Sequence, residues 1–269
     1  MPSRHARLLL ITLLTALMFP VIGAELADEN QVVIRGLELA VDDLKAAEHF
    51  YIEGLAFEIA RRHPQGEWSL LRNQSALLVL RHVPRPPEGS PQPYLNLRVA
   101  DLARAVRGAQ EAGARVADPS PQPNAIGSGV LITDPSGNPI NLMRIDGDSI
   151  AADSPPLLFN IGIRVSDMQA SESFLAALGL KVMTRSYLPK TLVWERNGGV
   201  SIVVHRYPDQ PEAGSSRGVL WATAPNPREH LDRLSESGWD AQAAAEAGPL
   251  PAGWMLQAPS GTRIRLTAP

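Results

Sequence analysis

The stretch TDPSGNPINL, residues Thr133–Leu142, recurs 124 residues later as QAPSGTRIRL, residues Gln257–Leu266. Each copy has the proline and glycine of a tight turn, because proline presets one backbone angle and glycine supplies an angle that other residues resist. A short strand is predicted to follow. Ile140 and Leu142 alternate there with Asn141, so we expect the two apolar residues to face a core and Asn141 to face away from it.

The same offset relates other parts of the chain. LELAVDDL at 37–44 matches IGIRVSDM at 161–168, and EAG at 111–113 matches ESG at 236–238 with an offset of 125. A regular offset of this kind is the signature of a duplicated unit, and about 120 residues is an ordinary size for one domain. The repeat predicts a first domain at 32–146, a linker at 147–156 that ends in a Pro-Pro pair, and a second domain at 157–269.

Each half divides again into two similar modules. Leu37, Leu39 and Val41 alternate with less apolar residues, which predicts a strand with one buried face, and Asp43 is placed to cap a following helix. YLNLRVADLARAVRGAQEAGARV at 94–116 begins the same plan again. The chain is therefore predicted to be α+β, with four strand–helix–strand–strand–strand (βαβββ) modules. Such modules form mixed sheets that have helices on one face and curl into a cup on the other.

The first 24 residues differ from the rest. Two arginines precede an apolar run at 8–18, and a small-residue pair at 23–24 follows, which is the layout of a secretory signal peptide. Its removal leaves no stable membrane anchor and predicts a periplasmic or secreted protein; an uncleaved amino-terminal anchor is the alternative. The chain has no cysteine, so disulfides are excluded. The formal charge of −3 becomes −5 after cleavage, which gives no attraction to nucleic acid.

These modules resemble the vicinal oxygen chelate (VOC) superfamily of glyoxalase I, extradiol dioxygenases and the fosfomycin- and bleomycin-resistance proteins. GLELAVDDLKAAEHFYIEGLAFE at 36–58, NIGIRVSDMQASESFLAALGLKV at 160–182 and the two turn sequences carry the resemblance. It implies two tandem VOC domains over nearly the whole mature chain. One departure is Ala56, where members of the superfamily usually have glycine after the helix.

The resemblance also implies a divalent metal held in the cups by histidine, glutamate or glutamine. The ligand positions, carried over to this chain, are Gly36, Val79, Tyr94, Asn141, Asn160, Val203, Val219 and Arg265. None is a histidine or a carboxylate, and an arginine opposes a dication. We therefore expect no metal and no other cofactor.

What the cups do contain suggests ligand binding. Alternation along the strands and the grouping by halves assign one set of side chains to a first cup: Glu38, Arg81, Tyr94, Asn96, Arg98, Asn141 and Met143. A second set is assigned to a second cup: Asn160, Arg164, His205, Trp221, Thr223, Arg263 and Arg265. Glu38 and Arg98 are candidates for an ion pair, and Arg164 with Arg265 for a joint anion site.

Three functions follow from this sequence. The favoured one is an exported, metal-free protein that binds a small anionic or aromatic molecule, as in the bleomycin-resistance branch. The second is a metal-dependent enzyme of the glyoxalase or extradiol dioxygenase type, against which the missing ligands argue. The third is a structural or protein-interaction module whose cups are filled by side chains. The oligomeric state is not predicted.

Overall fold

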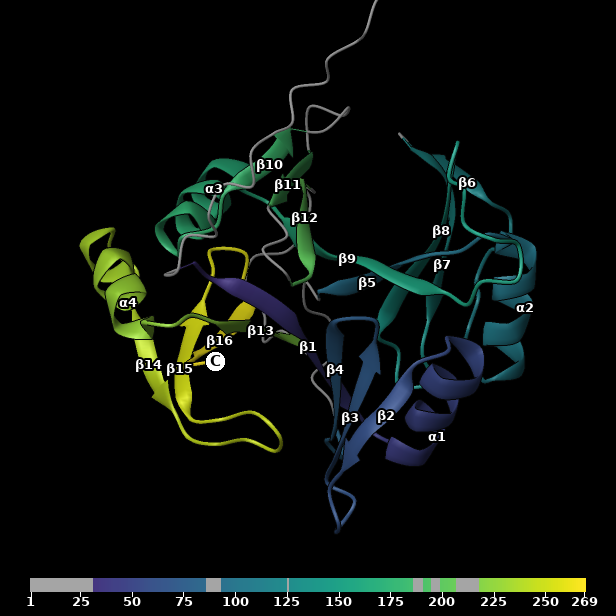
Figure 1. The fold of residues 1–269 in the computed structure, drawn as a ribbon, viewed down its shortest axis with the longest axis horizontal. Helices are drawn as coiled ribbons and strands as arrows, with labels where there is room; N and C mark the ends of the chain where they lie inside the picture. The colour runs from purple at the N-terminus through teal and green to yellow at the C-terminus, as the bar shows by residue number, and fades with distance from the viewer. Residues whose placement is uncertain (1–30, 86–92, 125, 186–190, 195–198, 207–217) are drawn as a thin grey trace, which may run out of the picture.

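The computed structural model describes residues 31–85, 93–124, 126–185, 191–194, 199–206 and 218–269. The predicted signal peptide lies outside these residues. Among the helices that they form, none is long and apolar enough to cross a membrane. The element order is the predicted one, a βαβββ pattern repeated four times, and this confirms the α+β class (Figure 1).

The modules are alike in outline. The first consists of β1 (Val33–Val41), α1 (Leu44–His49) continued by the π-helical turn η1 (Phe50–Gly54), β2 (Glu58–Arg62), β3 (Trp68–Asn73) and β4 (Ala76–His82). The second consists of β5 (Tyr94–Arg98), α2 (Leu102–Glu111), β6 (Gln122–Asn124), β7 (Gly127–Thr133) and β8 (Pro139–Ile145). The third consists of β9 (Leu157–Val165), α3 (Met168–Ala177), β10 (Val182–Arg185), β11 (Thr191–Trp194) and β12 (Ser201–Arg206). The fourth consists of β13 (Gly218–Thr223), α4 (Pro227–Glu236), β14 (Ala241–Ala244), β15 (Gly253–Gln257) and β16 (Arg263–Thr267).

The helix after Asp43 begins where the sequence predicts, and two later helices begin in the same way. Asp43, Asp101 and Asp167 each precede a helix in an extended conformation, and each accepts a hydrogen bond from a backbone N–H of the first turn. A side chain at this position satisfies donors that the helix itself leaves unpaired. The first strand and the first helix of a module are therefore joined in the same way three times along the chain.

The sheets pair the modules differently from the prediction. One eight-stranded sheet has the order β14-β15-β16-β13-β1-β4-β3-β2, so it joins the fourth module to the first. The other has the order β10-β11-β12-β9-β5-β8-β7-β6 and joins the third module to the second. The junctions are the antiparallel pairs β1–β13 and β5–β9. The ranges 32–146 and 157–269 still describe the sequence repeat, but each sheet takes one module from either side of the linker.

This pairing places the helices together on two flanks. Figure 1 shows the two sheets opening toward opposite sides of the view, with α1 and α2 on one flank and α3 and α4 on the other. One apolar core fills the space between helices and sheets and includes Phe50, Leu97, Phe174 and Ile264, all buried. We call the non-helical face of the β1–β13 sheet cup A, which carries Glu38, Arg81, Trp221 and Arg265. The same face of the β5–β9 sheet is cup B, which carries Tyr94, Asn96, Arg98, Asn141, Asn160, Arg164 and His205.

The opening turn now has a structural role. Buried Asp134 accepts hydrogen bonds from Tyr51 Oη at 3.2 Å and from the backbone N–H of Asn138 at 2.7 Å. Asn138 Nδ2 donates to Ala40 O at 3.1 Å, and Ser136 Oγ donates to Asp42 Oδ1 at 2.6 Å. The turn of the second module is thus hydrogen-bonded to the strand–helix junction of the first. The Asp134 carboxylate and the Asn138 Nδ2 group are both buried, and both have hydrogen-bond partners in the described residues.

The second copy of the turn keeps the backbone without the carboxylate. Ala258 replaces the aspartate, and its N–H donates to Thr262 O at 2.8 Å. Gly261 has φ of 76°, close to the 87° of Gly137 in the first copy. The shared proline and glycine therefore specify the turn, and the residues that differ specify what the turn binds.

Candidate functional site

The predicted site residues form two groups, and neither group is the predicted one. Tyr94, Asn96, Arg98 and Asn141 of the second module share cup B with Asn160, Arg164 and His205 of the third. Glu38 and Arg81 of the first module share cup A with Trp221 and Arg265 of the fourth. The assignment of whole cups to single halves was wrong, because the strands at the module junctions pair across the two halves.

Two predicted pairs are corrected for the same reason. Glu38 and Arg98 lie in different sheets and do not pair. Instead Arg81 binds Glu38 through two hydrogen bonds, of 2.6 and 3.0 Å. Arg98 Nε lies 3.2 Å from Asp148 Oδ2 in the linker. Arg164 and Arg265 also lie in different sheets, so they form no joint anion site.

Cup A is occupied by the chain itself. The loop at 245–252, between β14 and β15, supplies carbonyl oxygens to two of the cup's arginines: Arg81 Nη2 donates to Ala247 O at 2.9 Å, and Arg265 Nη1 donates to Ala245 O at 2.7 Å. Leu250 is 1% exposed and packs in a small apolar cluster with Trp68 and Val79. Backbone and side-chain atoms of this loop thus fill the space that the sequence assigned to a ligand.

Cup B holds a chain of three amides. The register sets Asn96 opposite Asn141 on β8 and opposite Asn160 on β9. Asn141 Nδ2 donates to Asn96 Oδ1 at 3.0 Å, and Asn96 Nδ2 donates to Asn160 Oδ1 at 2.6 Å. The Asn96–Asn160 bond crosses the junction of the second and third modules, so the amides fix one another's orientation at the centre of the sheet.

Beside the amides lies an aromatic and cationic group. The Arg164 guanidinium carbon lies 5.2 Å from the centroid of the Tyr94 ring, within the range of a cation–π contact. The His205 ring centroid is 6.1 Å from that of Tyr94, with the planes 34° apart. Gly162 makes room for this group, because a Cβ built there would lie 2.1 Å from Tyr94 Cζ. A glycine on β9 is therefore part of the site, and the sequence analysis did not identify it.

His205 is held neutral in this surrounding. Burial lowers its pKa to about 4, and the positive charge of Arg164 acts in the same direction. A neutral imidazole at ordinary pH carries one N–H donor and one acceptor. Around Tyr94, cup B therefore presents the Arg164 guanidinium, one neutral imidazole, a phenol and the amide chain, while Arg98 is paired with Asp148.

These donors do not fit the divalent metal that the superfamily implies. The carried-over positions of cup B meet as a phenol, two amides and Val203, and a neutral amide oxygen is a weak ligand. Those of cup A place Arg265 beside Gly36, Val79 and Val219, and a guanidinium repels a cation. Within the described residues there is also no cluster of three histidine, cysteine or acidic side chains.

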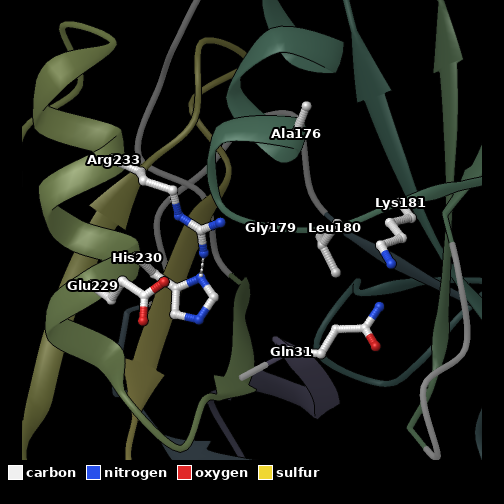
Figure 2. Close-up of a pocket in the computed structure, with 8 residues that line it drawn as sticks. All are labelled: Gln31, Ala176, Gly179, Leu180, Lys181, Glu229, His230 and Arg233. Atoms are coloured by element: carbon white, nitrogen blue, oxygen red, sulfur yellow. Dashed lines mark hydrogen bonds between the residues drawn. The ribbon is translucent and has the colours of Figure 1, made fainter. Parts of the chain in front are cut away.

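A third candidate lies outside both cups. A cavity of about 250 Å³ lies between the end of α3 and the side of α4, and Figure 2 shows the residues that line it. Lys181, Arg233 and Glu229 line it with exposed side chains, and Arg233 Nη2 lies 2.6 Å from Nδ1 of buried His230. No sequence pattern indicates this cavity, because its residues come from distant segments. The cavity is lined by positive side chains, by the negative side chain of Glu229 and by the C-terminal end of α3. This mixture of charges favours neither an anionic nor a cationic ligand.

Four βαβββ modules in two curled mixed sheets are the fold of the vicinal oxygen chelate superfamily, and this chain has that fold in tandem. Residues 33–143 match the family model described as glyoxalase-like domain. Among curated protein sequences, none matches the chain.

Solved structures agree with this assignment. Glyoxalase I from Zea mays is similar with a TM-score of 0.67 and 17% identity, over 89% of this chain and 93% of that one. A putative dioxygenase from Bacillus subtilis is similar with a TM-score of 0.64 and 8% identity, over 89% of this chain and 86% of that one. Identities this low establish a shared fold, and the activity has to be argued from the site.

Proposed function

We propose that this chain is an exported, metal-independent binding protein that holds a small planar anion in cup B. The observation that carries the proposal is the arrangement of Arg164 on the face of Tyr94, beside a neutral His205. A guanidinium fixed against a ring offers a planar, permanently charged donor to a carboxylate. The half-buried imidazole of His205 beside the ring offers a flat surface to an aromatic group.

The amide chain supports the same ligand class. Asn96, Asn141 and Asn160 are bonded in series, and each amide has capacity for further hydrogen bonds. Fixed neutral donors and acceptors orient a ligand without attracting a cation. An aromatic carboxylate satisfies all three parts of the site, which is why we choose it over a metal-bound substrate.

The alternatives receive less support. An enzyme of the glyoxalase or dioxygenase type needs a Lewis acid, and the donors of neither cup are suited to one. An interaction module is suggested by cup A, which its own loop fills, but not by the polar group in cup B. The likeness to maize glyoxalase I supports the fold and carries no argument for its activity.

The test is a titration with 4-fluorobenzoate, followed by ¹⁹F NMR. We expect wild-type protein to bind it and Arg164→Gln to bind at least about tenfold more weakly, since a charge-assisted hydrogen bond is worth roughly 1.5–3 kcal/mol. Arg144→Gln is the matched control, because Arg144 lies on β8, is exposed and pairs with Asp146. Absence of wild-type binding, or equal affinities of the two variants, would overturn the proposal.

Export is the second part of the proposal, and it rests on the charged and apolar pattern of residues 1–24. The prediction concerns the first residue of the mature chain. N-terminal sequencing of protein recovered from the producing cells is expected to start near residue 25. A chain that starts at residue 1 or 2 would contradict it.

A further inference from the structure

The loop at 245–252 reaches from one module into another. It leaves β14, turns at Gly248, which has φ of 64°, and returns to β15. The turn is closed by backbone bonds between Ala247 and Leu250 in both directions, of 3.1 and 3.2 Å. Although the loop belongs to the fourth module, the residues at its tip contact the first module.

Two apolar contacts hold the tip against β3 and β4. A Cβ built on Gly248 would lie 2.9 Å from Trp68 Cδ1, so the backbone there lies directly against the indole. Leu250 is buried against Trp68 and Val79. The rest of the loop is largely exposed, with Ala245, Glu246 and Pro251 facing solvent. Burial of one leucine therefore provides most of the apolar stabilisation of the closed loop.

Among the described residues, the polar contacts leave one cation of cup A without a bound anion. Glu38 is bound by Arg81 on both oxygens. Arg265, which is 6% exposed, donates to the neutral carbonyls of Ala245 and Pro251, at 2.7 and 3.3 Å. Its buried Nε has no hydrogen-bond partner in the described part of the chain. A buried guanidinium satisfied only by neutral oxygens, and incompletely, would be stabilised more by a carboxylate.

We infer that the loop at 245–252 is an internal plug that competes with an anionic ligand for Arg265, so that cup A is a latent second binding site. The loop imitates such a ligand: its carbonyl oxygens take the place of a carboxylate, and Leu250 takes the place of a short branched alkyl group. A small branched aliphatic carboxylate fits both positions. This inference does not depend on the function proposed for cup B.

A plug of this kind reduces the apparent affinity by the fraction of molecules in which the loop is open. Weakening the plug should therefore tighten binding, whereas a simple loss of structure would weaken it. The probe is 3-methylbutanoate, which combines a carboxylate with a branched alkyl group. Amide chemical shifts of ¹⁵N-labelled protein report its affinity and location.

For Leu250→Ala we expect an apparent affinity at least about fivefold higher than wild type, because the variant loses the buried anchor of the plug. Gly248→Ala is a second test that leaves Leu250 unchanged. Its added Cβ would clash with Trp68 and displace the loop, so the apparent affinity for the probe should rise as well. In wild-type protein the probe should speed the hydrogen exchange of the Ala247 and Leu250 amides and leave the amides of β16 unchanged.

Two double variants locate the binding. Leu250→Ala combined with Arg265→Gln should lose the gain, whereas Leu250→Ala combined with Arg164→Gln should keep it, since Arg164 belongs to cup B. Folding of each variant is checked by its melting temperature, and Gly248→Ala decides the matter if Leu250→Ala does not fold. Affinity that fails to rise in the folded variants, or a rise that persists without Arg265, would overturn the inference.

Discussion

At the scale of single residues, the hydrogen bonds between the turn of the second module and the first module include one to a buried carboxyl group, that of Asp134. Burial raises the pKa of Asp134, although hydrogen bonds from Asn138 and Tyr51 act in the opposite direction. The pKa of Tyr51 is also raised, first by burial and then by the charge of Asp134. The folded protein therefore holds a proton on Asp134 more tightly than the unfolded chain does, and its stability is linked to pH.

The sign of that linkage gives a prediction. A folded-state pKa above the unfolded value contributes stability that is complete below the unfolded pKa, 3.8 for aspartate, and is lost as pH rises through the folded value. The free energy of unfolding of wild type, minus that of Asp134→Asn, should fall as the pH rises from 3.8 toward neutral. Urea denaturation across this range measures it. The difference cancels groups that titrate in both proteins, and a flat or rising difference would show that Asp134 ionises normally.

At the scale of an element, the end of the first helix uses an unusual residue. Ala56 has φ of 56°, in the left-handed region, and its N–H donates to Ile52 O while the N–H of Phe57 donates to Tyr51 O. In the third module Gly179, with φ of 99°, follows α3 in the equivalent place. The sequence analysis identified Ala56 as an alanine at a position where the superfamily usually has glycine. The structure shows the consequence, which is that a residue with a side chain adopts the left-handed conformation there.

Ala56→Gly should therefore stabilise the protein by about 0.5–1 kcal/mol, because relief of the left-handed strain exceeds the added freedom of the unfolded chain. The Ala56 side chain is exposed, so its removal costs no packing. Gly179→Ala is the matched reverse change and should destabilise, since its Cβ would also lie 3.0 Å from His230 Nδ1. Equal melting temperatures for wild type and Ala56→Gly would contradict the prediction.

The sequence patterns of single elements predicted those features of the fold that depend on residues close together in the chain. The alternation in β1, the aspartate caps and the turn at Thr133–Leu142 each depend on neighbouring residues, and each is present in the structure. The loop at 245–252 was not predicted to enter cup A. It contributes backbone carbonyls, which every sequence has, and Leu250 alone marks it as buried.

At the scale of the whole molecule, the pairing of modules was beyond the sequence pattern. The strands β1, β5, β9 and β13 begin their modules and share the same alternation, so any of them is suited to pair with any other. The structure pairs first with fourth and second with third. That choice separates Arg164 from Arg265 and brings Arg164 to Tyr94, which changes the predicted site.

The two cups that result from this pairing differ in what occupies them. Cup A is filled by Leu250 and by carbonyls that bind Arg81 and Arg265. Cup B keeps its polar side chains around Tyr94 and Asn96. In both cups the side chains at the superfamily's ligand positions are amide, phenol, aliphatic or guanidinium groups, so the account assigns recognition to hydrogen bonds and charge rather than to a metal.

The measurement that tests this claim most directly is the titration of 4-fluorobenzoate with and without an excess of EDTA. The account predicts the same affinity in both conditions and the same loss on Arg164→Gln, because the guanidinium, not a chelated ion, binds the carboxylate. Binding that disappears with EDTA and returns when a divalent cation is added back would contradict it.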